Sequence, residues 1–229
     1  MEYIICASLL TITIILFKFI FKINFKQIKE LQENSELSEI VDKFPENIEI
    51  AKDYLEMLDN KDVKIEEAKD TKTSLYIAVT NKIIIADMKN NYARLQVIAH
   101  ECIHSVQDKT LLLFNFVFSN IAIIYFLIAL TLTVFKIFDN VMLQLFILTF
   151  ISLIQFSIRS YLEIDAMIRS RFLVQEYIED KKLINEKEKN ELLVEYEKIN
   201  KVGIPFVIDN LLTTYILRIL TYIIIGIIF

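Results

Sequence analysis

Three residues in one short stretch have the types and spacing needed to bind a catalytic metal ion. His100, Glu101 and His104 lie within residues 97–106, and the two histidines are the only ones in the chain. On a helix, residues four positions apart share one face, so both imidazoles can direct a ring nitrogen at one ion while Glu101 lies beside it. The spacing therefore predicts a Zn²⁺ site, with one ion per chain.

The composition indicates that this helix belongs to a membrane protein. Hydrophobic residues make up 55% of the 229 residues and the mean hydropathy is +0.45, whereas soluble domains have an apolar share of about 45–50%. The net charge of −5 gives no indication of nucleic-acid binding. Cys6 and Cys102 offer no disulfide framework, as expected for a chain in a reducing cytosol.

Four apolar segments are long enough to cross a bilayer of about 30 Å at about 1.5 Å per helical residue. They lead us to expect an N-terminal transmembrane anchor at 1–21, a cytosolic domain with the motif helix at 22–110, a transmembrane hairpin at 111–158, cytosolic helices with the third zinc ligand at 159–203, and a C-terminal transmembrane helix at 204–229. The expected fold class is mainly α: a multi-span helical membrane protein with a small cytosolic α+β domain of zincin-like metallopeptidase type.

Basic residues near the ends of the spans predict the orientation of the chain. Most of them follow the first and third spans: Lys18, Lys22, Lys26, Lys29, Arg159, Arg169 and Arg171. Only Lys136 lies in the turn between the second and third spans. By the positive-inside rule the polar segments face the cytoplasm, so we expect a multi-pass membrane protein with its motif on the cytoplasmic side.

The topology also selects a third zinc ligand, which a hydrolytic site needs beside one open position for water. The short turn after the second span makes the second and third spans antiparallel neighbours. His104 then lies about 10 Å of helix before the membrane and Glu163 about 7 Å after it, which puts both at one level. We favour Glu163 over Asp165, which projects from a different face of the helix. The alternative for Glu163 is an ion pair with Arg159 one turn back.

The stretch from Asn47 to Gln107 resembles the bacterial membrane-bound neutral zinc metallopeptidases of the YugP type, a gluzincin-like family. It includes Asn47-Ile-Glu-Ile-Ala-Lys-Asp-Tyr-Leu and His100-Glu-Cys-Ile-His-Ser-Val-Gln, and Glu163-Ile-Asp-Ala166 fits the Glu-x-x-Ala context of that family. The resemblance covers most of the chain and implies zinc on His100, His104 and Glu163, with Glu101 as the catalytic base.

These residues together predict a zinc metalloendopeptidase whose substrates are peptides or membrane proteins at the bilayer surface. Zinc would polarise a peptide carbonyl and acidify water, and Glu101 would accept the water proton and return it to the leaving amine. One alternative is an HtpX-like or CAAX-processing peptidase, although Met167 stands where those families carry Asp. Another is a catalytically inactive zinc-binding scaffold. An intramembrane protease is disfavoured because the motif precedes its span.

Three further segments indicate the structure that surrounds the motif. Alternating apolar residues at 75–80 and 83–86, separated by Asn81-Lys82, predict a β-hairpin that either pairs with an extended substrate or covers the helices. Residues 46–58 have helical apolar spacing and are expected to pack around the motif helix. Residues 172–201 are charged and predict a solvated helix or helix pair.

Several polar residues have candidate roles that the sequence leaves open. Tyr161, Arg169 and Arg171 lie near Glu163 in sequence and are candidates for stabilising an oxyanion. Asp209 and Arg218 stand inside the last apolar segment, where they are costly unless they face other helices, lie near an interface or snorkel. A structural role is favoured for Arg218 over substrate or lipid binding.

Overall fold

A computed structural model describes residues 2–24, 34–68, 71, 73–88, 91–137 and 140–229. Within these ranges the chain is 75% helical, with seven helices and a three-stranded sheet. The chain divides into two compact units. The first comprises Met1–Ile23, Phe114–Tyr161 and Pro205–Phe229, and the second comprises Asn24–Leu113 and Leu162–Ile204. Lys26, Lys29 and residues 138–139, which were used to predict the orientation and the turn, lie outside the described residues.

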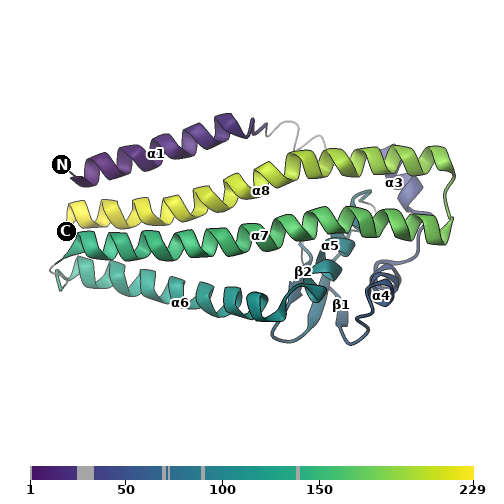
Figure 1. Cartoon of the computed structure of the whole chain (residues 1–229), viewed down its shortest axis with the longest axis horizontal. Helices are drawn as coiled ribbons and strands as arrows, with labels where there is room; N and C mark the ends of the chain where they lie inside the picture. The colour runs from purple at the N-terminus through teal and green to yellow at the C-terminus, as the bar shows by residue number, and fades with distance from the viewer. Residues whose placement is uncertain (1, 25–33, 69–70, 72, 89–90, 138–139) are drawn as a thin grey trace. The chain divides into compact units, whose positions relative to one another are not determined.

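Four helices are long and apolar enough to cross a membrane, which confirms the expected number of apolar spans. They are α1 (Glu2–Ile20), α6 (Lys109–Val134), α7 (Val141–Lys181) and α8 (Glu186–Ile228). In the first unit, α6, α7 and α8 run side by side (Figure 1) around a core that includes Ala129, Leu148 and Tyr222. Residues of α1, among them Cys6 and Leu10, pack against this core.

Asp209 and Arg218, the charged residues of the last span, contact other helices of the first unit. This is one of the three placements that the sequence allows for them. Asp209 is buried and accepts a hydrogen bond from the ammonium of Lys18 on α1 at 2.8 Å. Arg218 donates to Gln155 on α7 at 3.1 Å, and its guanidinium also lies over the ring of Tyr215. Asp209 and Arg218 are thus each matched with a partner on another helix.

The second unit contains α3 (Ser35–Val41), α4 (Asn47–Met57), the sheet, α5 (Arg94–Val106) and the charged parts of α7 and α8. Helix α4 confirms the helix expected at residues 46–58. Ala51 and Leu55 are buried as expected, whereas Ile48 is only half-buried, and Ile50 and Tyr54 complete the inward face. The expected charged helix pair is the end of α7 and the start of α8.

The sheet has the strand order β1-β3-β2 and includes the predicted hairpin. Strands β2 (Leu75–Ile77) and β3 (Lys82–Ala86) are antiparallel. The first strand is shorter than expected because residues 78–81 form the turn and Asn81 adopts a positive φ of 48°, which asparagine tolerates. Strand β1 (Lys64–Ala68), parallel to β3, was not predicted, because Glu66 and Glu67 hide its apolar alternation.

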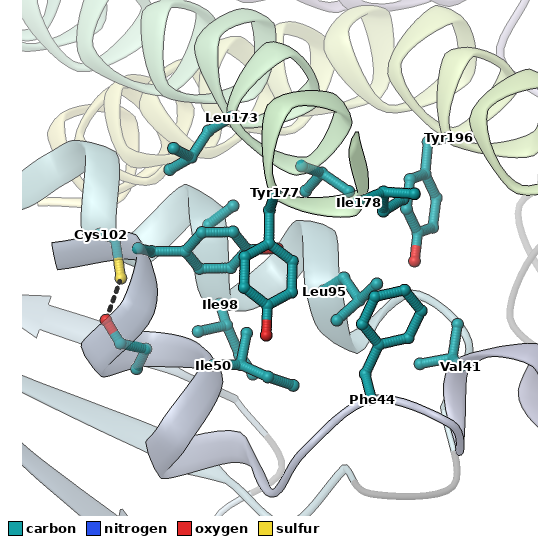
Figure 2. Close-up of a cluster of buried hydrophobic side chains, with 14 of the residues drawn as sticks. Val41, Phe44, Ile50, Leu95, Ile98, Cys102, Leu173, Tyr177, Ile178 and Tyr196 are labelled. Atoms are coloured by element: carbon teal, nitrogen blue, oxygen red, sulfur yellow. Dashed lines mark hydrogen bonds between the residues drawn. The ribbon is translucent and has the colours of Figure 1, made fainter. Parts of the chain in front are cut away.

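The core of the second unit holds the motif helix in place. Figure 2 shows this core, in which side chains from α5 meet those of α4, α7, α8 and the segment after α3. Its labelled members are Val41, Phe44, Ile50, Leu95, Ile98, Cys102, Leu173, Tyr177, Ile178 and Tyr196. Because positions 95, 98 and 102 of α5 face this core, the face that carries positions 100 and 104 is turned elsewhere.

A buried arginine fastens the first turn of α5 to the segment between α3 and α4. The guanidinium of Arg94 is almost fully buried and donates four hydrogen bonds of 2.8–3.1 Å. Its acceptors are the backbone oxygens of Val41, Phe44 and Pro45 and the side-chain oxygen of Asn47. Charge-assisted bonds to carbonyls at the end of a helix replace the hydration that the buried cation lost.

Candidate metal centre

Helix α5 places the two histidines one turn apart on the same face. The Nε2 atoms of His100 and His104 are 3.1 Å apart, and the two rings are nearly perpendicular, with centroids separated by 4.6 Å. Both side chains are partly exposed, at 19% and 13%. Two nitrogens at this separation can bind the same ion, as the spacing in the sequence predicted.

Helix α7 supplies the carboxylate that completes a triangle of ligand atoms. The Oε2 atom of Glu163 lies 3.4 Å from Nε2 of His100 and 3.9 Å from Nε2 of His104. The separation expected between two ligand atoms, each about 2.0–2.1 Å from a tetrahedral Zn²⁺ ion, is roughly 3.3 Å. The three sides of the triangle therefore fit a tetrahedral ion with only small adjustments.

The donor set also agrees with zinc in type and number. Two imidazole nitrogens and one carboxylate oxygen form a ligand set that Zn²⁺ takes in hydrolytic sites, and three protein ligands leave one coordination position for water. Among the described residues, His100, His104 and Glu163 are the group of His, Cys, Asp and Glu side chains whose ligand atoms converge within 4.8 Å. Cys102 is not part of it, because its thiol is buried in the core and donates to the backbone oxygen of Ala51 at 3.8 Å (Figure 2).

Glu101 is a buried carboxyl beside this triangle, with an exposed fraction of 7%. Burial raises its pKa to about 7, an effect that is partly opposed by the charge of His100 and by a hydrogen bond from the backbone N–H of Tyr76. The contact with Tyr76 places the carboxylate next to strand β2. A carboxyl with a pKa near neutrality can both accept and return a proton, as a general base in peptide hydrolysis must.

The two histidines experience opposite electrostatic effects. Burial lowers the pKa of His100, but the hydrogen bond to Glu163 and the charges of Glu101 and Glu163 outweigh it, so that the net pKa is raised. Burial and the charge of His100 lower the pKa of His104, and the hydrogen bond to Gln107 opposes them only in part. The carboxylates thus make this site attractive to positive charge, whether a proton or a metal cation.

Gln107, directly after α5, contacts the site and was not singled out from the sequence. Its Oε1 lies 2.7 Å from Nδ1 of His104, and its Nε2 donates to the backbone oxygen of Leu162 and to Oδ2 of Asp165, both at 2.8 Å. Asp165, the alternative third ligand, is therefore engaged by this amide and lies outside the triangle. The position of Gln107 three residues after His104 is the only sequence signal that could have indicated it.

Tyr161, Arg169 and Arg171 are the candidates for stabilising an oxyanion that the sequence indicates. Arg169 pairs with Asp165 at 3.4 Å and Arg171 with Glu197 at 3.1 Å. Tyr161 belongs to the first unit, and its side chain is 61% exposed. Both arginines thus already have carboxylate partners, and their role in an oxyanion site stays a hypothesis.

Comparison with models of known protein families, with curated proteins and with solved structures found no match. The resemblance to the YugP-type metallopeptidases therefore stays a prediction from the motif and its context. The geometry of the triangle does not depend on that resemblance.

Proposed function

We propose that the protein is a membrane-bound zinc metallopeptidase in which His100, His104 and Glu163 bind one Zn²⁺ ion and Glu101 is the general base. The observation that carries this proposal is the triangle of three ligand atoms from two helices, with sides of 3.1, 3.4 and 3.9 Å. A buried carboxyl directly follows the first ligand in sequence, as hydrolysis of a peptide bond by metal-bound water requires.

A bound zinc ion would supply Lewis acidity towards the peptide carbonyl and towards a water molecule. The carboxylate of Glu101 would accept a proton from that water and deliver it to the departing amine nitrogen. Its pKa of about 7 suits both steps near neutral pH. His100, His104 and Glu163 would hold the ion and leave a position for water.

Strand β2 offers a natural place for an extended peptide substrate. It is at the edge of the sheet and pairs with β3 on one side. The backbone of Tyr76 in this strand touches the carboxylate of Glu101, and Leu75 and Val79 expose apolar side chains, at 40% and 55%. A peptide aligned with this edge through main-chain hydrogen bonds would pass beside the general base and bind with loose sequence preference.

The cellular setting of the proposal is the cytoplasmic face of the bacterial inner membrane. Four helices have the length and apolarity of membrane spans. Lys18 lies in the last turn of the first of them, and Lys22 and Arg159 follow the first and third apolar segments. The substrates would then be peptides or membrane proteins whose cleavage sites reach the cytoplasmic surface.

The test combines metal analysis with cleavage by the purified full-length protein in detergent. Wild type should contain one zinc per chain and cleave fluorescein-labelled casein in a chelator-sensitive manner. Glu101→Gln should keep zinc but lose about 10²–10⁴-fold in activity, and His104→Ala should lose the metal. Glu176→Gln, which changes an exposed glutamate on α7, is the matched control and should behave like wild type.

The outcome also separates the peptidase from a zinc-binding scaffold. Tight zinc binding without cleavage of casein, and without uncleaved proteins accumulating in membrane fractions of Glu101→Gln cells, would favour the scaffold. Cleavage that is unchanged in Glu101→Gln would overturn the peptidase proposal, since no other group is assigned to accept the water proton.

A further inference from the structure

The amide of Gln107 joins the two helices that carry the candidate ligands. Its side chain is almost fully buried, with 7% exposed, at the end of α5. One end of the amide faces Nδ1 of His104 at 2.7 Å, and the other faces the backbone oxygen of Leu162 and Oδ2 of Asp165 on α7, each at 2.8 Å. All hydrogen-bonding partners of this amide thus lie on or next to the residues that form the triangle.

These partners determine which way the amide must point. A backbone carbonyl oxygen such as that of Leu162 can only accept a hydrogen bond, so the NH₂ group of Gln107 has to face α7. The amide oxygen then faces Nδ1 of His104, and because this oxygen can only accept, Nδ1 must carry the ring proton. In the neutral ring, Nε2 is then left with its lone pair free, and Nε2 is the atom that points into the triangle.

The same amide also contacts the turn of α7 that carries the proposed third ligand, Glu163. Leu162 and Asp165 lie on either side of Glu163 in helix α7, and Asp165 is held in turn by Arg169 at 3.4 Å. Two hydrogen bonds from one NH₂ group therefore hold the turn of α7 that presents the Glu163 carboxylate.

We propose that Gln107 is a positioning residue, which fixes His104 in the Nδ1–H tautomer and ties it to the turn of α7 that carries Glu163. This inference rests on the proposed zinc site, but not on peptide hydrolysis. Outer-shell partners of this kind typically change metal affinity by about 10–100-fold when removed. Gln107 would thus act on the metal through its ligands, without touching the metal or the substrate.

The chain offers a closely matched control in Gln96. This glutamine is also buried, at 5%, lies on the same helix, and is also hydrogen-bonded to another helix through Asn200 at 2.7 Å. Its amide nitrogen donates to Asn200 on α8, and not to a ring nitrogen of either histidine. Gln107→Met and Gln96→Met therefore each remove one buried interhelical amide, but only the first removes an amide that touches a ligand.

The experiment uses full-length protein in detergent, with nitrogen-15 label in its histidines. Because the chain has only two histidines, the ring signals are few and assignable by a His100→Gln variant. In metal-free wild type, His104 should be the Nδ1–H tautomer. Gln107→Met should lose that preference and raise the zinc dissociation constant by about 10–100-fold, measured by competition with a chelator. Gln107→Glu, which keeps an acceptor for Nδ1–H, should retain the tautomer.

The results that would overturn the proposal are an Nε2–H tautomer in wild-type His104, or a loss of zinc affinity in Gln107→Met no greater than in Gln96→Met. The tautomer of His104 is measured in wild type and does not require the Gln107→Met variant. The test therefore survives if Gln107→Met fails to fold. Wild type that binds zinc with this tautomer but cleaves no peptide would defeat the peptidase proposal and leave the role of Gln107 supported.

Discussion

The two units of the chain use their buried polar side chains in different ways. In the first unit, polar contacts between helices include the pairs Lys18 with Asp209 and Arg218 with Gln155. In the second unit, one side chain often serves several partners, as Arg94 does with four acceptors and Gln107 with three. Apolar packing holds the helices in both units, and in the second unit Arg94 and Gln107 add polar contacts to several partners at once.

The proposed metal site would account for this difference. A bundle of apolar helices tolerates a sliding of one helix along another, because one apolar contact replaces another at little cost. A metal site requires ligand atoms placed within about 0.5 Å, and hydrogen bonds are directional enough to achieve that. Loss of one polar residue should therefore cost more in the second unit than in the first.

The largest effect is expected for Arg94→Met, which removes all four hydrogen bonds at the start of α5. The variant removes the guanidinium donor from the backbone oxygens of Phe44 and Pro45 and from the side-chain oxygen of Asn47, while the oxygen of Val41 keeps the N–H of Phe44. We expect the free energy of unfolding to fall by about 3–5 kcal/mol, measured as the unfolding midpoint in detergent.

Lys61→Met is the control for Arg94→Met, since it breaks an exposed, solvent-screened ion pair with Glu56 and should change the unfolding midpoint far less than Arg94→Met. If Arg94→Met were no more destabilising than Lys61→Met, the comparison between the units would lose its strongest example.

Removal of the metal should have the next largest effect. Zinc at 100 times its dissociation constant stabilises a protein by about 2.7 kcal/mol if only the folded state binds it, so a chelator should lower the melting temperature of wild type. Glu163→Ala should abolish the stabilisation by zinc, whereas Asp165→Asn should retain most of it because Asp165 lies outside the triangle. The reverse pattern would show that the third ligand has been assigned to the wrong carboxylate.

Features that depend on composition or local spacing could be predicted from the sequence. The four apolar helices follow from hydropathy, and the position of the hairpin follows from alternation. The convergence of Glu163 with the histidines was expected from helix lengths on either side of a short turn, and the two helices do bring these side chains within 3.4 and 3.9 Å. Their binding of zinc stays a prediction.

What the sequence did not reveal depends on contacts between distant segments. Strand β1 is recognisable only through its pairing with β3, because its own residues are mostly charged. The role of Gln107 arises from the backbone of Leu162, 55 positions later, and no local pattern marks a backbone oxygen as a future partner. The same holds for Arg94, whose acceptors are mostly backbone oxygens.

A smaller effect is expected from Asn200→Leu, which interrupts a polar chain across three helices of the second unit. Asn200 on α8 accepts from Gln96 on α5 and donates to the backbone oxygen of Met167 on α7, both at 2.7 Å. Its loss leaves the side-chain NH₂ group of Gln96 without its acceptor. The free energy of unfolding should fall by about 2 kcal/mol, which is measured through the unfolding midpoint. Asn210→Leu, at an exposed position of the same helix, should stay within about 0.5 kcal/mol of wild type; equal effects would mean that the chain of amides adds nothing.

The smallest effect is expected in the first unit, where Lys18 and Asp209 allow a double-mutant cycle. Asp209 is 2% exposed and Lys18 38% exposed, so Lys18→Met, which leaves a buried carboxylate without its ammonium, should be more destabilising than Asp209→Asn. The double variant should recover part of the loss, with a coupling of about 1 kcal/mol, as for interhelical polar pairs in membranes. A coupling as large as the effect of Arg94→Met would mean that the first unit, too, depends on its polar contacts, and the contrast between the units would disappear.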